Sequence, residues 1–245
     1  MDRQITYENL RQFAYSNDKL VKGPIRGIIL VFFGLGSTAM FGEPMDVNEG
    51  VPYGEQGILY LLPYNNPWCW MNPQAVDFVD EVLDVLFEHY DLPENTPIIS
   101  TGGSMGGQSA LTYMAYAKRT PVACLANCPV CDMVYHYTER FDLPRTIYSA
   151  LHQTEGSLEE GLKSLSPLHL AERMPKVPYY LFHCSEDKMV NIDRHSKVFA
   201  ARMEELGHRV VTDYTCGVVH CNLTEAAQKK WKEICIDEIN KNAVV

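Results

Sequence analysis

The stretch that decides the fold is IISTGGSMGGQ, residues 98–108. Its first residues, Ile98–Ser100, have the β-branched character of a short buried strand, and a helix is expected from about Gln108 to Lys118. Between the two lies a Gly-x-Ser-x-Gly centred on Ser104, the pattern of a nucleophile elbow. The alternatives are a glycine-rich structural turn or a phosphate-binding loop. The strand–turn–helix context favours the elbow, so we interpret Ser104 as a nucleophile.

Strand-like and helix-like segments alternate on both sides of this stretch. Ile25–Phe33 is a continuous β-branched and aromatic run, typical of a strand buried on both faces. Residues 75–90 repeat apolar side chains at the spacing of an amphipathic helix. We expect further strands at 58–62, 122–126, 179–183 and 209–214, and further helices at 193–206 and after Asn222, a good N-cap. This order predicts an α/β architecture with a mostly parallel sheet.

Residues 130–175 interrupt the alternation. They contain no long strand signal, but scattered aromatic residues, two helix-like pieces and prolines at 144, 167 and 175. We interpret this segment as a lid-like insertion within a single domain that spans residues 1–245.

A serine needs a base to become a nucleophile, and the base needs an orienting acid. Asp187 lies in a loop after the expected strand 179–183, and His220 lies between the last expected strand and the last helix. The chain order Ser104, Asp187, His220 is the order found with a nucleophile elbow. Alternatively, Asp187 is a solvated loop acid and His220 a satisfied loop histidine, and Glu186 is a competing acid.

An oxyanion hole requires two backbone donors. The N–H of Met105, which follows the nucleophile at a helix N-terminus, is the first candidate. The second should come from the loop after the strand 25–33, where Leu35 is our first choice and Gly36 our second. The alternative is that the glycines of this loop only allow the chain to turn.

Several aromatic residues are candidates for the wall of a substrate site. Trp68 and Trp70 lie in a loop after the expected strand 58–62, and Tyr135 and Tyr148 lie in the insertion. Packing within the protein is the alternative for all of them.

The eight cysteines, in a chain without an apparent export signal, are expected to be reduced thiols. Cys128 and Cys131 form a C-x-x-C, but a structural zinc site usually takes four ligands and no second pair exists. A regulatory disulfide between Cys216 and Cys221, which flank His220, is a further alternative. We expect no metal and no cofactor.

The composition is that of an ordinary globular protein, with 46% hydrophobic residues and a net charge of −10. The acidic balance argues against nucleic acid and anionic membranes as partners. The polar start Met1–Gln4 and the short apolar stretch 27–33 favour a cytoplasmic chain with no membrane segment. The sequence is compatible with a homo-oligomer but does not determine the oligomeric state.

These motifs resemble the α/β-hydrolase superfamily, and within it the single-domain esterases and the catalytic domain of the prolyl oligopeptidase family. The resemblance rests on GGSMGG at 102–107, Ser166-Pro167-Leu168, Glu186–Val190 and a histidine about thirty residues after the acid. It runs from about residue 24 to the end. One departure is Phe33-Gly34-Leu35-Gly36, where many relatives have a histidine before the glycines.

The resemblance implies an α/β-hydrolase fold: a mostly parallel central sheet, helices on both faces and a small helical lid after the sixth strand. It also implies acyl transfer through an acyl-enzyme, with a small-molecule ester as substrate. No β-propeller domain precedes this region in the sequence, so we favour esters of small or medium acyl groups over peptides. The alternatives are aminopeptidase, acyl-peptide hydrolase-like or acyltransferase activity, or a non-catalytic binding protein of the same fold.

Overall fold

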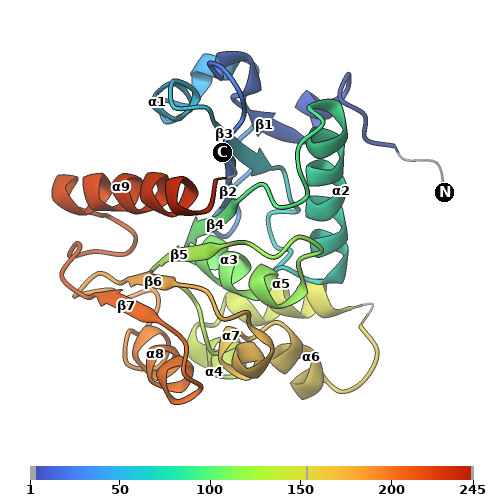
Figure 1. The fold of residues 1–245 in the computed structure, drawn as a ribbon. Coiled ribbons are helices and arrows are strands. Elements are labelled where there is room, and N and C mark those ends of the chain that lie inside the picture. The colour runs from blue at the N-terminus through green and yellow to red at the C-terminus, as the bar shows by residue number, and fades with distance from the viewer. Residues whose placement is uncertain (1–3, 153, 244–245) are drawn as a thin grey trace.

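The computed structural model describes residues 4–152 and 154–243 and centres on one seven-stranded sheet (Figure 1). Neighbouring strands follow the order β1-β3-β2-β4-β5-β6-β7, and all pairs are parallel except β1 with β3. The expected α/β class with a mostly parallel sheet is therefore confirmed. The strands are β1 (Ala14–Ser16), β2 (Gly27–Phe32), β3 (Ile58–Pro63), β4 (Ile98–Gly103), β5 (Ala123–Asn127), β6 (Tyr179–Phe182) and β7 (Val210–Asp213).

The register of the central strands brings their carboxyl ends to one edge of the sheet. Phe32 of β2 pairs with Gly102 of β4, and Gly102 pairs with Ala126 of β5. The segments that follow these three strands therefore emerge side by side. In open parallel sheets this edge is where ligands bind.

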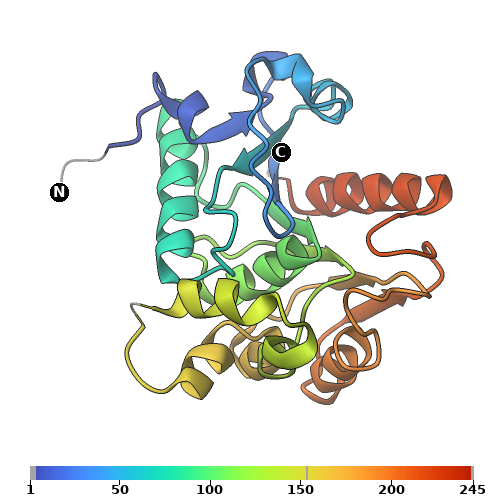
Figure 2. The same cartoon turned by 180° about the vertical axis from the view of Figure 1, so that it is seen from behind.

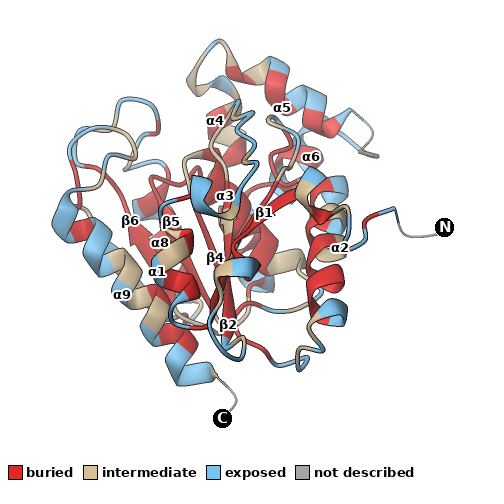
Figure 3. Cartoon of the chain, turned by 90° about the horizontal axis from the view of Figure 1, so that it is seen from above, coloured by how far each residue is buried: buried red, intermediate tan, exposed pale blue. Residues whose placement is uncertain are grey.

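Helices cover both faces of the sheet, as expected (Figure 2). Alternate strand residues point to opposite faces: Leu30 packs with one helical layer and Ile29 with the other. The first layer is α2 (Pro73–His89), α3 (Met105–Tyr116) and α8 (Ser196–Glu205), and the second is α1 (Gly50–Gly54) and α9 (Glu225–Asn242). Seen from above, the strands form a buried layer between helices whose outer sides are exposed (Figure 3).

The expected helix starts differ from the structure by two or three residues. Helix α2 begins at Pro73 rather than at residue 75, and α8 begins at Ser196 rather than at residue 193. The helix after the elbow begins at Met105 rather than Gln108, directly after Ser104. The last helix is capped by Thr224, whose hydroxyl accepts the N–H of Ala227, and not by Asn222. Asn222 lies in the preceding turn, next to an isolated bridge between Gly217 and Leu223.

The segment 130–175 lies between β5 and β6, so it follows the fifth strand and not the sixth. Among the residues described before it, β1, three residues long and antiparallel to β3, is the one strand that was not expected. Such a short strand carries too little alternation to be recognised in the sequence. The segment contains α4 (Met133–Glu139), α5 (Leu143–Leu151), α6 (Leu158–Ser164) and α7 (Pro167–Leu170).

The insertion shares a buried apolar cluster with the rest of the protein. Leu143 and Ile147 of α5 pack in it together with Trp70, Met105 and Val190. Met105 follows Ser104 and Val190 lies in the loop that contains Asp187, so the insertion rests directly on the segments that carry the candidate site. Short 3-10 helices complete the fold at Leu10–Gln12, Asp18–Leu20, Pro44–Asp46 and Ala171–Arg173.

Among the described residues, no helix combines the length and the apolar character that crossing a bilayer requires.

Candidate active site

Ser104 occupies a strained turn between β4 and α3. Its φ of 59° lies in the left-handed region, which is uncommon for a residue other than glycine and marks functional turns. A Cβ on Gly102 would collide with the carbonyl oxygen of Gly106, and a Cβ on Gly106 would collide with the carbonyl oxygen of Phe32. Both glycines are therefore required by close backbone approach, as the elbow pattern predicts.

His220 lies within hydrogen-bond distance of Ser104. Its Nε2 is 2.9 Å from the Ser104 Oγ, although the two residues are far apart in sequence. The loop that carries His220 connects β7 to α9 and is held against the loop after β6 by two backbone bonds. Ser185 N–H donates to the Gly217 carbonyl at 3.0 Å, and Glu186 N–H donates to the Val218 carbonyl at 2.9 Å. These bonds fix the histidine loop relative to the acid loop.

Asp187 is the acid that contacts His220. Its Oδ2 lies 2.6 Å from His220 Nδ1, and its side chain has no exposed surface. Oδ1 accepts the N–H groups of Met189 at 2.8 Å and Val190 at 3.0 Å. Glu186, the competing acid, is exposed, and only its backbone N–H takes part in the contact between the two loops.

The hydrogen bonds keep the Asp187 carboxylate ionised. Burial opposes its ionisation, but bonds from His183 and His220 and from the two amides outweigh burial and hold the pKa of Asp187 well below its usual range. His183 is a partner that the sequence analysis missed, with its Nε2 3.3 Å from Asp187 Oδ2. Its place directly after β6 was the available signal, because side chains at this point reach the carboxyl edge of the sheet.

The contact between Asp187 and His220 also shifts the pKa of His220, but upward. Burial alone would lower the pKa of His220, but the hydrogen bond and the negative charge of Asp187 raise this pKa above the usual range of histidine. In the neutral ring, the network assigns the proton to Nδ1, which donates to Asp187. Nε2 then carries the lone pair that accepts the Ser104 hydroxyl proton.

The loop after β2 runs beside Ser104, where an oxyanion hole would form. A Cβ on Gly34 would lie 3.9 Å from the Ser104 Cβ. Gly36 does not fit as a donor, because its N–H already donates to the Pro67 carbonyl at 2.9 Å. Within residues 4–152 and 154–243, no acceptor takes the N–H of Leu35 or Met105.

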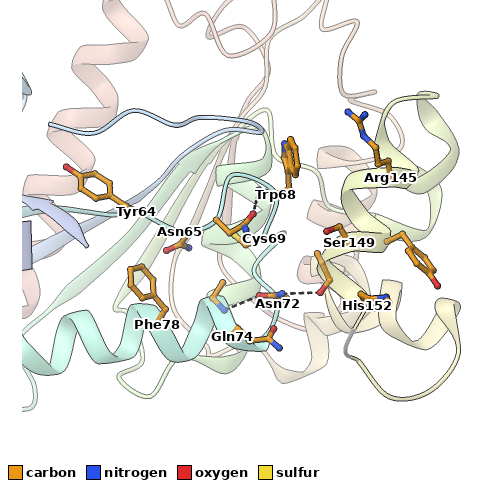
Figure 4. A pocket seen from close by; sticks show the side chains of 14 residues that line it. Tyr64, Asn65, Trp68, Cys69, Asn72, Gln74, Phe78, Arg145, Ser149 and His152 are labelled. Atoms are coloured by element: carbon orange, nitrogen blue, oxygen red, sulfur yellow. Dashed lines mark hydrogen bonds between the residues drawn. The ribbon is translucent and has the colours of Figure 1, made fainter. Parts of the chain in front are cut away.

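The four aromatic candidates separate into two groups. Trp68 and Tyr148 are exposed and line a cavity of about 620 Å³ (Figure 4). Trp70 is not a wall of this cavity: it is 1% exposed, and its indole N–H donates to the Thr146 hydroxyl. Tyr135 also lies elsewhere, with Arg194 over its ring. Packing explains Trp70 and Tyr135, since each already has partners within the protein.

Thiols surround the histidine side of the site. Cys221 Sγ lies 3.7 Å from His220 Nε2, and Cys128 Sγ accepts the N–H groups of Cys184 and Cys221. The eight cysteines, including Cys131 and Cys216, are free in the structure. Contact with Cys221, together with burial, raises the pKa of the Cys128 thiol.

Among the described residues, three groups of donor atoms lie close enough together to hold a metal ion. They are Cys128–His220–Cys221, Cys128–His183–Asp187 and His136–Glu139–His195. Each group contains atoms that already form hydrogen bonds within the protein, such as His220 Nε2 with Ser104. We therefore assign these donors to the protein's own network.

Comparison with known proteins agrees with the geometry. A family model described as the prolyl oligopeptidase family matches residues 71–237. No curated protein matches the chain.

Similar solved structures include the acylaminoacyl peptidase of Pyrococcus horikoshii (TM-score 0.67, 15% identity, 91% of this chain and 38% of that chain). A puromycin-hydrolyzing peptidase of Mycobacterium tuberculosis has a TM-score of 0.68 and 16% identity, and covers 91% of this chain and 35% of that chain. Esterase B of Lactobacillus rhamnosis has a TM-score of 0.66 and 11% identity, and covers 90% of this chain and 78% of that chain. The chain thus spans little more than a third of the length of the two peptidases.

Proposed function

Because this chain belongs to the prolyl oligopeptidase family of serine hydrolases, we propose that it cleaves carboxylic esters of small or medium acyl groups through an acyl-enzyme. The observation that carries the proposal is the unbroken chain of hydrogen bonds from Asp187 through His220 to Ser104. It joins a buried carboxylate, an imidazole and a hydroxyl in the order that nucleophilic catalysis requires.

In the proposed reaction, Ser104 Oγ attacks the ester carbonyl while His220 Nε2 takes its proton. Asp187 holds the imidazole in the correct tautomer and stabilises the imidazolium that forms. His220 then gives the proton to the leaving alcohol, and the acyl group stays on Ser104. A water molecule, deprotonated by His220, releases the carboxylic acid and restores the serine.

We propose that the N–H groups of Met105 and Leu35 stabilise the oxyanion. Both are free of acceptors within the described chain, and Gly34 brings the second loop against Ser104. Removing one such donor typically costs about 10²–10³-fold in kcat.

The chemistry of the cavity lined by Trp68 and Tyr148 supports esters over substrates with a free amino terminus. An aminopeptidase needs a carboxylate that binds the α-ammonium group. No acidic residue lines the 620 Å³ cavity in the described chain, whereas Arg145 does. Acyl-peptide hydrolysis is the second candidate, because a blocked amino terminus carries no such charge and structural neighbours include acylaminoacyl peptidases.

A fluorophosphonate probe tests the proposal without knowledge of the natural substrate. Wild-type protein should be labelled, and Ser104→Ala and His220→Ala should not. Circular dichroism of each variant verifies that it is folded. A folded wild-type protein that resists labelling would contradict the proposal and favour a non-catalytic role.

Rates on p-nitrophenyl esters and on acetyl-aminoacyl anilides then separate the two activities. The ester proposal expects kcat/KM to be higher for the esters, even after correction for their faster spontaneous hydrolysis. Comparable rates on the anilides would favour the acyl-peptide activity.

A further inference from the structure

The cavity lined by Trp68 and Tyr148 lies between the loop after β3, the start of helix α2 and helix α5 (Figure 4). Its volume of about 620 Å³ is within the usual range for small-molecule sites. The lining combines aromatic rings with side-chain amides. The rings are Tyr64, Trp68, Phe78 and Tyr148, and the amides are Asn65, Asn66, Asn72 and Gln74. We call this cavity the distal pocket.

The charge of the distal pocket is opposite to that of the whole chain. The chain carries a net charge of −10. In the described chain, however, the pocket is lined by the cationic side chain of Arg145 and by no carboxylate. The guanidinium of Arg145 lies 6.0 Å from the centre of the Trp68 ring. In the described chain the arginines in ion pairs are Arg11, Arg119, Arg140 and Arg202, so Arg145 has no acidic partner there. The pocket thus offers a free cation beside an exposed aromatic face.

A buried polar atom in the lining lacks a partner. The side-chain oxygen of Asn65 is buried and accepts no hydrogen bond. By contrast, the side-chain oxygens of Asn66 and Asn72 accept the N–H groups of Trp68 and Ala75. A buried acceptor without a partner is costly in free energy.

The distal pocket adjoins the candidate oxyanion loop. Asn65, Asn66 and Cys69 line it and also line a small neighbouring cavity with Gly34 and Met105. A Cβ on Gly36 would lie 3.9 Å from the indole nitrogen of Trp68. The loop that runs beside Ser104 therefore also forms the border of the pocket.

The strand order decides which half of an ester faces the pocket. Ser104 follows β4, the oxyanion loop follows β2 and the Trp68 loop follows β3, so the pocket lies on the β2–β3 side. His220 lies on the opposite, β5 side, where the Asn127 amide donates to the Cys221 carbonyl. The leaving alcohol must receive its proton from His220 and belongs on that side. The acyl group is therefore directed toward the distal pocket.

We propose that the distal pocket binds the far end of the acyl group, and that this end carries a carboxylate next to a flat apolar segment. Arg145 binds the carboxylate and Trp68 stacks on the flat segment. This inference deepens the proposed ester hydrolysis and rests on it. The guanidinium geometry matches a carboxylate bidentately, but exposure of Arg145 to water limits the gain.

A matched substrate pair tests the inference. The p-nitrophenyl ester of 3-(4-carboxyphenyl)propanoic acid is compared with its 4-carbamoyl analogue, which has the same shape and no charge. We expect wild-type kcat/KM to be about fivefold to tenfold higher for the carboxylate, from the strength of a charge-assisted pair at a partly exposed site. Arg145→Gln should abolish the preference, and Arg145→Lys should keep part of it.

Arg173→Gln is the matched control. Arg173 also lies over an aromatic ring, 4.7 Å from the centre of Tyr116, but it does not line the distal pocket. Its substitution should leave the preference intact. Equal rates of the wild-type protein on the two esters, or a preference that survives in Arg145→Gln, would overturn the inference.

A binding measurement separates this inference from the proposed hydrolysis. The free acid 3-(4-carboxyphenyl)propanoate is titrated into Ser104→Ala while tryptophan fluorescence is recorded. We expect saturable quenching that disappears in Ser104→Ala/Arg145→Gln and in Ser104→Ala/Trp68→Leu. Quenching together with inactivity of the wild-type protein on all esters would refute the hydrolysis and keep the pocket. Hydrolysis of the carbamoyl ester without quenching would refute the pocket alone.

Discussion

In the part of the chain that the structure describes, we compare two clusters that pair a carboxylate with imidazole rings, one centred on Asp187 and one on Glu139. Asp187 lies 2.6 Å from His220, and Glu139 lies 2.6 Å from His136 and 2.9 Å from His195. In both clusters, hydrogen bonds from the imidazoles outweigh burial and hold the pKa of the carboxyl well below its usual range.

The two clusters differ in what their remaining atoms do. His195 Nδ1 accepts the N–H groups of Cys131 and Asp132, so its proton is on Nε2 and points to Glu139. The other oxygen of Glu139 accepts the N–H of Asn191 at 3.0 Å. His220 instead keeps 22% of its side chain exposed and directs a lone pair at Ser104. The hydrogen bonds of the Glu139 cluster connect separate segments of the protein, whereas the lone pair of His220 faces a hydroxyl whose proton it can accept.

We expect the largest effect on kcat when the hydroxyl is removed from the cluster of Asp187, His220 and Ser104. Ser104→Ala should lower kcat on a p-nitrophenyl ester by about 10⁶-fold, as for other serine hydrolases that lose the nucleophile. The melting temperature should hardly change, because alanine only deletes an oxygen atom. Hydrolysis by the variant within tenfold of wild type would assign the reaction to another group.

We expect the second largest effect on kcat from a substitution of the orienting acid. Asp187→Asn should lower kcat by about 10⁴-fold, since the amide favours the wrong imidazole tautomer. Glu186→Gln is the control, one residue away and exposed, and should change kcat by less than about twofold because a surface charge contributes little. Steady-state kinetics of both variants on one ester checks this. If Glu186→Gln lowered kcat more than Asp187→Asn does, Glu186 would be the orienting acid in place of Asp187.

The structural cluster should respond in stability rather than in rate. Glu139→Gln replaces the carboxylate that both imidazoles contact with a neutral amide and should lower the free energy of unfolding by about 2 kcal/mol, because hydrogen bonds to a charged acceptor are stronger than those to an amide. Glu172→Gln, which removes an exposed partner of Arg202, should cost less than about 1 kcal/mol. Urea titrations followed by circular dichroism measure both. If Glu139→Gln instead abolished ester turnover at full stability, the distinction between the clusters would fail.

The smallest effect is a shift in pH dependence. Only neutral His220 accepts the serine proton, so kcat/KM should rise with pH. Since Asp187 raises the pKa of His220, the midpoint should lie above about 6.5, the ordinary value for histidine. NMR titration of the ring in Ser104→Ala should give the same direction, and Asp187→Asn should move the midpoint down. A midpoint at or below the ordinary value would show that burial dominates.

The sequence predicts those parts of this comparison that depend on chain order. The buried run of β2, the elbow around Ser104 and the placement of Asp187 and His220 after strands follow from local pattern and topology. Burial of single side chains does not. Trp68 and Trp70 lie two residues apart in one loop, yet only Trp68 reaches the cavity.

The Glu139 cluster could not be predicted from the sequence either. Glu139 ends a short helix of the insertion, and its partners His195 and Asn191 come from the segment before α8. Only the tertiary packing brings these residues together. The same holds for Gly36, whose N–H is occupied by a carbonyl from a different loop.

The apolar cluster shared by Met105, Val190 and the insertion has a consequence for engineering and for evolution. Substitutions at Leu143 or Ile147, on the inner side of α5, perturb the neighbours of the nucleophile and of the acid loop together. Specificity and reactivity cannot vary independently there. The outer side of the same helix carries Arg145, Tyr148 and Ser149, which line the distal pocket outside this cluster. A mutant library restricted to these three positions can therefore explore new acyl groups while the reactive cluster keeps its geometry.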